Sequence, residues 1–276
     1  MKIMKRLLII CIATLLAYSS AYGWGRREHA VVAKIAENHL TAEAKQMLHE
    51  YMHRRSLVYY AHYADDYQPI LIDLGWKPSN DEQKVPFPHS FSVDKDFKPY
   101  RDVRKGDKYV KNCIYFIDKW AKELKTDHAT MNDSVRMMHI ALIVHAVGDM
   151  HSPVRIRYPH DNTLCRYKVK YGKKSRSLFE LWDSGFLAST HSIQSYTDFA
   201  RFIDIRTEEQ IAEICRGDVW SWGEEIARDA VAMRNYKPDE EIDPVKFKRD
   251  NLDRGEDLLR KAGYRLAKIL NEIFVR

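Results

Sequence analysis

The segment at 133–150 constrains the fold most strongly, because it combines an apolar helical pattern with a histidine and an aspartate. From His139 to His151 it reads HIALIVHAVGDMH. His145 and Asp149 lie four residues apart, so a helix places them on one face. Most other residues of this stretch are apolar, which predicts a helix enclosed by the rest of the protein. A buried imidazole and a buried carboxylate are costly unless they pair with each other or bind a metal, and the pattern allows both.

Helical periodicity recurs along the chain and predicts an all-α fold. It is present at 30–52, 104–124, 193–203, 207–215, 218–235 and 250–275. Thr41 stands where an N-cap would begin the second half of the first of these segments. Prolines break helices within 64–102, and 152–176 is basic and irregular in pattern. No sequence repeat or low-complexity linker divides the chain, so we expect residues 24–276 to form one mainly helical domain.

The first 23 residues have the layout of a secretory signal peptide. Basic residues precede a short apolar stretch at 7–16, and Ala21-Tyr22-Gly23 supplies small residues for a cleavage site. The apolar stretch is too short to span a membrane. We therefore expect cleavage before Trp24, a product without a membrane span, and a secreted or periplasmic location. We also expect a monomer.

Three cysteines follow the predicted cleavage site. They are Cys113, Cys165 and Cys215. In an exported protein they allow at most one internal disulfide and one spare thiol. The sequence does not determine their pairing, and the pattern is not that of a disulfide scaffold.

Net charge by itself indicates little about partners. The whole chain carries a formal net charge of +6, and removal of the basic signal peptide leaves a milder value, too small to predict nucleic-acid binding. Basic residues do concentrate at 152–176, interleaved with tyrosines. Such a loop can hold a phosphate backbone and stack bases. A solvated charged loop explains the same pattern equally well.

Further residues that can bind a metal are scattered outside the apolar helix. They are His29, Asp65, His89 and Asp183, together with the α-amine that cleavage would expose at Trp24. Imidazole and carboxylate ligands in a chain with few cysteines suit zinc in a catalytic site. The amine has a reference pKa of about 7.7–8.0, so a metal can displace its proton near neutral pH. Each residue alone is more often a surface or capping residue, and only the set favours a metal site.

In order and spacing, these residues resemble the single-strand-specific zinc nucleases of fungi and plants, which share a helical fold with bacterial zinc phospholipase C. The matching motifs are Trp24-Gly-x-x-x-His29, Tyr63-Ala-Asp65, His89, His145-x-x-Gly-Asp149-x-His151-x-Pro153, Leu181-Trp-Asp183-Ser-Gly185, Trp222-Gly-Glu-Glu225 and Ala262-Gly-Tyr-Arg-Leu-Ala267. The resemblance spans essentially the whole mature chain. It implies a mainly helical zinc hydrolase, with loops lining a metal cleft, that acts on single-stranded nucleic acid or nucleotides.

The resemblance also implies how zinc would be bound. One ion would be held by Asp65, His89, His145 and Asp149. A second would be held by the amine and carbonyl of Trp24, by His29 and by a bridging Asp149. P–O bonds would be hydrolysed by a metal-activated hydroxide that Asp65 or Asp149 orients.

The family's third zinc site is altered in this sequence. Arg155 and Phe179 replace its two histidines, and only Asp183 remains of its ligands. Arginine is not a normal zinc ligand, and phenylalanine has no ligand atom. We therefore expect two zinc ions. Three residues could rebuild the third site, namely His151, His160 and Glu180.

Alternatively, Arg155 replaces the third ion. A guanidinium can pair with Asp183 and still donate to a phosphate, where the leaving oxygen develops negative charge. On this hypothesis Arg155 is catalytic, and further substrate contacts come from the basic loop. The expected contacts are Tyr158, Arg166 and Lys168.

Other departures from the family pattern affect the expected substrate rather than the metal pair. Glu28 stands where the family usually has glycine, Gln68 replaces an arginine, and Ser90 and Ser92 occupy positions that help to hold a base in the nucleases. Two alternative functions follow. One is a phospholipase C-like hydrolase of another phosphodiester, and the other is a non-catalytic metal- or nucleotide-binding protein on the same fold.

Overall fold

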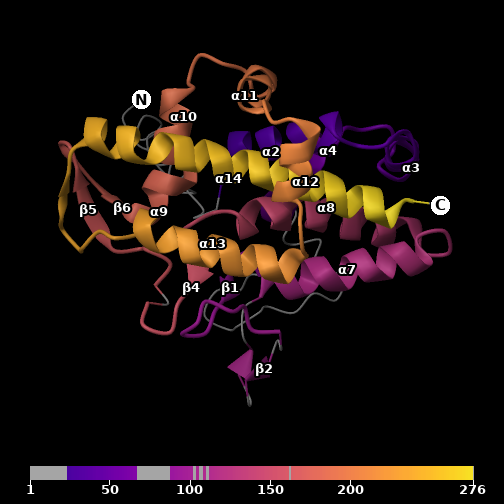
Figure 1. Ribbon diagram of the computed structural model, residues 1–276, viewed down its shortest axis with the longest axis horizontal. Helices are drawn as coiled ribbons and strands as arrows, with labels where there is room; N and C mark the ends of the chain where they lie inside the picture. Colours follow the sequence, from indigo (N-terminus) through magenta and orange to yellow (C-terminus); the bar gives the residue numbers. More distant parts are fainter. Residues whose placement is uncertain are drawn as a thin grey trace, which may run out of the picture.

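The computed structural model describes residues 24–66, 88–101, 104–105, 108–109, 112–161 and 163–275. Its longer helices are α2 (Arg26–Asn38), α3 (Ala42–Tyr51), α7 (Cys113–Asp127), α8 (Asp133–Met150), α13 (Val219–Met233) and α14 (Pro244–Ile273), shown in Figure 1. The mainly helical fold that the sequence predicts is confirmed. The expected signal peptide and Gln68 lie outside the described residues.

Shorter helical segments connect these helices. They are α4 (Leu57–Tyr60), α5 (Tyr63–Asp66), α9 (Leu178–Glu180), α10 (Phe186–Thr190), α11 (Tyr196–Ile203), α12 (Glu208–Ile214) and a π-helical turn, η1 (Leu181–Gly185). A side-chain cap begins α3 at the residue that the sequence predicts. The Thr41 hydroxyl accepts a hydrogen bond from the Ala44 amide at the start of α3, which satisfies an amide that the helix leaves unpaired.

The predicted helix at 104–124 is wrong in its first part. Asn112 accepts a hydrogen bond from the Tyr115 amide and caps α7, so the helix begins only at Cys113. The preceding residues instead form a short antiparallel pair of β2 (Arg104–Lys105) and β3 (Lys108–Tyr109). Helical spacing of apolar residues did not reveal this boundary, because the cap lies inside the periodic stretch.

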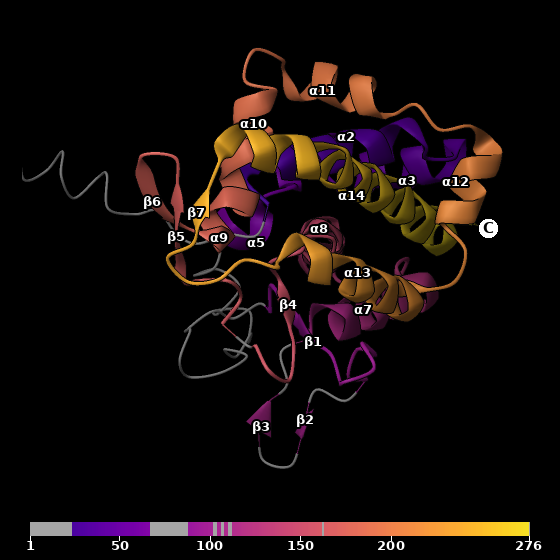
Figure 2. The ribbon, with the colours of Figure 1, turned by 60° about the vertical axis from the view of Figure 1, so that its left-hand side comes forward.

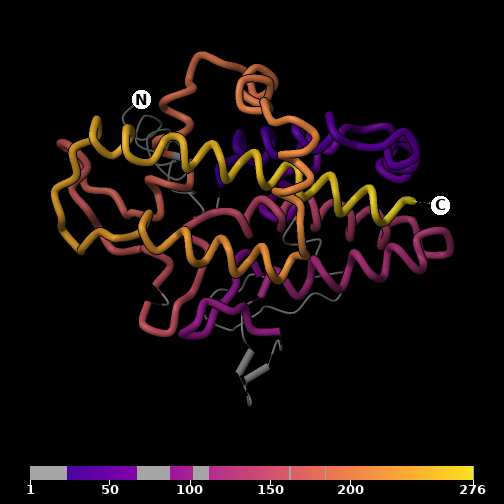
Figure 3. Tube along the Cα trace, viewed as in Figure 1, coloured from indigo at the N-terminus to yellow at the C-terminus, as the bar shows by residue number. Residues whose placement is uncertain are grey.

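The central helix is α8, as its apolar pattern predicts. Every residue from Met138 to Met150 is buried. The helix packs against α7, α14 and α2, and Figure 2 shows it between α2 and α14 on one side and α7 and α13 on the other. A helix that is apolar nearly all round is most stable when other helices cover it on every side, because burial removes its apolar side chains from water. The same packing joins the first and last of the longer helices, since α2 runs beside α14 (Figure 3).

The protein also contains short strands, which the sequence does not predict, but the fold remains mainly helical. β1 (Phe91–Ser92) pairs in parallel with β4 (Ile156–Arg157). Part of the predicted basic loop forms a hairpin of β5 (Lys168–Tyr171) and β6 (Lys174–Ser177), and β7 (Glu241–Ile242) pairs in parallel with β5. The first pairing is the important one for function, because it brings the chain after His89 beside the chain after Arg155.

The structure also settles points that the sequence left open. Cys113, Cys165 and Cys215 are buried free thiols, so none of them forms the disulfide that the sequence allowed. In the part of the chain that the structure describes, no helix is long and apolar enough to cross a membrane.

Candidate metal centre

The C-terminal half of α8 supplies two of the predicted ligands, and both are fully buried. The Nδ1–H group of His145 donates to the Ala61 carbonyl at 2.9 Å. This bond fixes the tautomer that presents Nε2 to the site, as metal-binding histidines commonly require. His145 Nε2 lies 3.2 Å from Asp149 Oδ2, as expected for residues four apart on one helix face.

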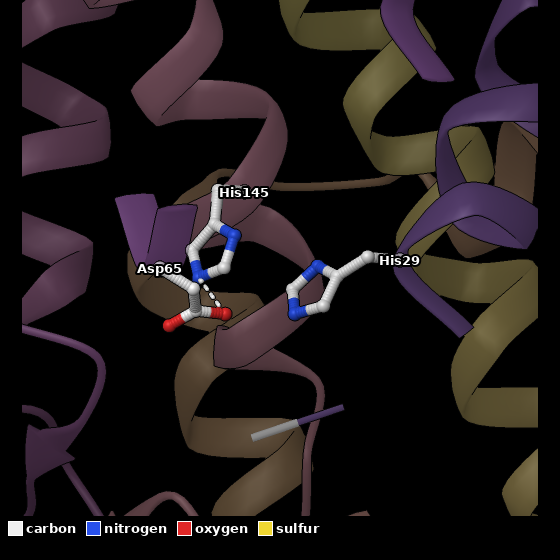
Figure 4. Close-up of side chains that lie close together, drawn as sticks. All are labelled: His29, Asp65 and His145. Carbon is white, nitrogen blue, oxygen red and sulfur yellow. Dashed lines mark ion pairs between the residues drawn. The ribbon is translucent and has the colours of Figure 1, made fainter. Parts of the chain in front are cut away.

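Two groups of potential ligand atoms converge on this helix. One contains His89, His145 and Asp149, and the other contains His29, Asp65 and His145; within each group the ligand atoms all lie within 4.8 Å of one another. Figure 4 shows the second group, with His29 and Asp65 facing His145 from separate segments. The His29 ring stacks on the His145 ring with 4.2 Å between centroids. The structure therefore brings five of the predicted ligands together.

Asp149 lies between these imidazoles, and its two oxygens face different ones. Oδ1 lies 3.5 Å from His29 Nε2, whereas Oδ2 lies 2.7 Å from His89 Nδ1. Oδ1 and both ring nitrogens of His29 are buried and have no hydrogen-bond partner among the described residues. Buried polar atoms normally have partners, so this arrangement fits a centre that binds cations.

Electrostatics favour the metal-binding protonation states of Asp65, Asp149 and His29. Burial lowers the pKa of His145, but the charges of Asp65 and Asp149 outweigh burial, so this pKa is raised instead. Burial alone would raise the pKa of Asp65, but the neighbouring imidazoles of His145 and His89 lower it to about 2. Burial also opposes ionisation of Asp149, but Arg155 and His145 hold its pKa well below the ordinary value. Burial and the charge of His145 lower the pKa of His29 to about 4. Ionised carboxylates and a neutral imidazole are the forms that bind metal ions.

The N-terminal segment is fixed against the Trp-Asp motif. Trp24 is fully buried, and the amide of Gly25 donates to the carbonyl of Asp183 at 2.7 Å. Asp183 is itself buried in η1, and burial raises its pKa to about 8 although Arg155 opposes the shift. The predicted ligands Trp24 and Asp183 therefore lie in adjoining backbone segments, but Asp183 belongs to neither group of converging ligand atoms.

Arg155 and Phe179 are in contact with each other, beside the ligand groups. Arg155 is 3% exposed, and its guanidinium carbon lies 5.2 Å from the centre of the Phe179 ring. The Arg166 guanidinium lies 5.1 Å from the centre of the same ring. The Phe179 ring therefore makes cation–π contacts with both arginines. Arg155 Nε is 3.5 Å from Asp149 Oδ1. Its Nε and Nη2 have no hydrogen-bond partner in the described part of the chain.

The residues that could rebuild a third zinc site all have other contacts. His151 Nδ1 donates to the Val147 carbonyl, and its Nε2 accepts from Arg265. Glu180 accepts from the Ser177 amide and caps α9. His160 is exposed and stacks on Tyr158. These contacts weigh against a rebuilt site.

Two predicted substrate contacts from the basic loop, Tyr158 and Lys168, contact other parts of the protein. Tyr158 is buried, and its hydroxyl donates to the Ala227 carbonyl at 2.7 Å, which ties the loop to α13. Lys168 is exposed on β5 and lies 3.6 Å from Glu180. The structure therefore brings Arg155 and Arg166 together on one ring, and the role of Tyr158 and Lys168 as substrate contacts stays a prediction.

Two residues beside the ligands, Glu28 and His62, were not predicted from the sequence to belong to the site. Glu28 is buried, burial raises its pKa to about 7, and its charge contributes to the raised pKa of Asp183. Its place before His29, where the family usually has glycine, was the available signal. His62 lies 2.9 Å from Asp65, and its position three residues before that aspartate was the signal for it.

Comparisons with known proteins agree with the mainly helical fold. The family model for S1/P1 nuclease matches residues 24–275. Nuclease S1 of Aspergillus oryzae is 26% identical over 300 residues, covering 98% of each chain. Endonuclease 2 of Arabidopsis thaliana is 22% identical over 189 residues, covering 67% of this chain and 63% of the plant protein. The matches favour a phosphodiester hydrolase of the nuclease type over the phospholipase C-like and non-catalytic alternatives, and this chain belongs to the S1/P1 nuclease family.

Proposed function

We propose that this protein is a zinc-dependent nuclease or nucleotide phosphoesterase that hydrolyses P–O bonds in single-stranded nucleic acid or nucleotides. The position of Asp149 carries the proposal. Its Oδ1 faces His29 at 3.5 Å, and its Oδ2 faces His89 at 2.7 Å. A carboxylate whose oxygens face separate imidazoles can bridge two metal ions, which is the geometry that a paired catalytic site requires.

The donor set fits zinc. Nitrogen and carboxylate oxygen ligands without a cysteine are typical of catalytic zinc sites. One ion would be held by Asp65, His89, His145 and Asp149, and the second by Trp24, His29 and Asp149. Bound zinc would supply Lewis-acid chemistry and would activate the attacking water near neutral pH. Asp65 and Asp149 would orient that water.

Arg155 supplies positive charge at the position of the altered third site. Its buried guanidinium lies beside Asp149 and against Phe179, where an imidazole ligand would otherwise stand. Nε and Nη2 have no hydrogen-bond partner among the described residues and can donate to a phosphate oxygen. Arg166 lies on the same ring and adds a second donor group. We propose that these two arginines bind the scissile phosphate and stabilise charge on the departing oxygen.

Signal cleavage before Trp24 fits the proposed zinc centre. The family match begins at Trp24, the residue that signal cleavage is expected to expose. Cleavage there would free the amine that the second zinc requires. We propose a secreted or periplasmic monomer.

The deciding experiment is zinc analysis of purified protein beginning at Trp24, combined with turnover of a single-stranded oligonucleotide. We expect about two zinc ions per chain, together with hydrolysis that a chelator abolishes. A protein without zinc would contradict the metal centre. A panel of DNA, RNA, nucleotide and phosphatidylcholine substrates separates nuclease from phospholipase activity. Zinc binding without turnover of any substrate would indicate a binding protein.

A further inference from the structure

His62 lies beside the metal centre without belonging to either group of converging ligand atoms. It follows α4, immediately before α5, and its side chain is 8% exposed. Its ring lies edge-on to the His29 ring, with 5.9 Å between centroids, and edge-on to the His145 ring, with 6.0 Å between centroids. The imidazole therefore contacts ligand side chains from two helices, α2 and α8.

Both ring nitrogens of His62 face carboxylates. Nε2 lies 2.9 Å from Asp65 Oδ2, and Nδ1 lies 3.2 Å from Asp66 Oδ1 in a hydrogen bond. Asp65 is a predicted zinc ligand, whereas Asp66 is partly exposed and points away toward α2. One imidazole thus connects a carboxylate at the metal centre with a carboxylate outside it.

Asp66 continues the connection to the helix that carries His29. Arg26 donates to both of its oxygens, from Nη1 at 2.9 Å and from Nη2 at 2.5 Å. Arg26 is the first residue of α2, and His29 lies one turn later. The series Arg26, Asp66, His62 and Asp65 therefore links the two segments that must hold their ligands at a fixed separation.

We propose that His62 is a positioning residue for the metal centre. It holds the Asp65 carboxylate in the orientation that binds an ion, and Asp66 and Arg26 in turn hold His62. Groups that contact metal ligands from outside commonly change metal affinity by roughly 10–100-fold. This proposal rests on the proposed zinc centre, and it assigns to His62 and Asp66 a role in metal affinity that acts through Asp65.

The test measures zinc affinity by competition with a chromophoric chelator for three variants. His62→Phe keeps an aromatic ring but loses both polar contacts, and we expect roughly 10–100-fold weaker zinc binding. His62→Gln retains a donor that can reach Asp65, and we expect it to recover most of the lost affinity. His49→Phe changes an exposed histidine on α3 and serves as the matched control. Cobalt substitution adds a second readout, because a displaced Asp65 alters the visible absorption of the bound ion.

The outcomes separate positioning from ligation and from general instability. Wild-type zinc affinity in His62→Phe would overturn the proposal. Loss of one whole ion per chain in both His62 variants would also overturn it, because His62 would then be a ligand. Melting temperatures measured with chelator show whether each variant folds. If wild-type protein binds no zinc, the proposed function itself fails before any variant is compared.

A double-mutant cycle tests the link through Asp66. Asp66→Asn should weaken zinc binding less than His62→Phe does, because Asp66 acts through the imidazole. The double variant should then lose no more affinity than His62→Phe alone, since contacting residues in one network are not additive. Fully additive losses would show that Asp66 and His62 act separately.

Discussion

A Cβ atom placed on Gly148 would lie 2.6 Å from Nδ1 of His29. Side chains do not tolerate such an approach, so only glycine lets α2 bring its histidine against the ligand-bearing face of α8. The glycine that precedes Asp149 is therefore part of the geometry of the metal centre, although it has no ligand atom. This contact gives a physical reason for the glycine immediately before the ligand Asp149.

Gly148→Ala should displace His29 while α8 remains helical, because alanine favours helix interiors. We expect zinc content to fall from about two ions to about one per chain, with hydrolysis largely lost. Elemental analysis and circular dichroism check both parts. His29→Ala should give the same zinc content, and adding Gly148→Ala to it should cause no further loss. Unchanged zinc content in Gly148→Ala would contradict the role of this contact.

Asp149→Asn should remove zinc and activity together, because one amide cannot replace a carboxylate whose two oxygens face separate imidazoles. Zinc content and oligonucleotide turnover are measured on the same preparation. If the variant keeps both zinc ions and remains active, the bridging role of Asp149 is wrong.

Arg155→Ala should lower kcat by roughly 100-fold or more while zinc content stays unchanged, because the residue stabilises charge rather than binding metal. Arg176→Ala, at an exposed position in the same basic region, is the matched control. A fall in zinc content would mean that Arg155 maintains the metal centre instead of acting on substrate.

The contact between Arg155 and Phe179 predicts a gain of metal binding. Replacing both residues by histidine places two imidazoles beside Asp183, and we expect about one additional zinc ion per chain. The single variant Phe179→His, which keeps the guanidinium, should not gain the ion. Equal zinc content in the double variant and the wild type would show that other residues also prevent binding there.

Asp183 should make the metal-free protein less stable at high pH. Burial raises its folded pKa to about 8 from an ordinary 3.8, so the folded state binds the proton more tightly than the unfolded state. Its contribution to stability is fully present below about pH 4 and is lost as the pH rises through about 8. Asp183→Asn should therefore melt roughly 5 °C above wild type at pH 8 in chelator, with a smaller difference at pH 5. The same difference at both pH values would exclude this titration as the cause.

Tyr158→Phe should affect stability rather than substrate binding. The hydroxyl donates to the Ala227 carbonyl in a buried position, and losing that bond costs about 1 kcal/mol. KM for an oligonucleotide should remain unchanged. A several-fold rise in KM would instead show that Tyr158 contacts the substrate, as the sequence predicts.

The sequence by itself determined the features that depend on neighbouring residues. Helical periodicity and capping residues such as Thr41 gave most helix positions, because they act within one or two turns. The spacing of His145 and Asp149 placed both on one face of a buried helix for the same reason. Family motifs then indicated which distant residues share the centre, although spacing alone could not bring His29 or His89 to that helix.

Only the tertiary structure decided how the distant residues meet. The pairing of β1 with β4, the approach of His29 to Gly148, and the separate contacts of Asp149 all join segments far apart in the chain. The burial of Glu28 and the series of contacts from His62 to Arg26 also arise from packing between segments that are far apart in the chain. Side-chain direction, burial and charge at such positions depend on which segments pack together, and no local pattern in the sequence encodes that choice.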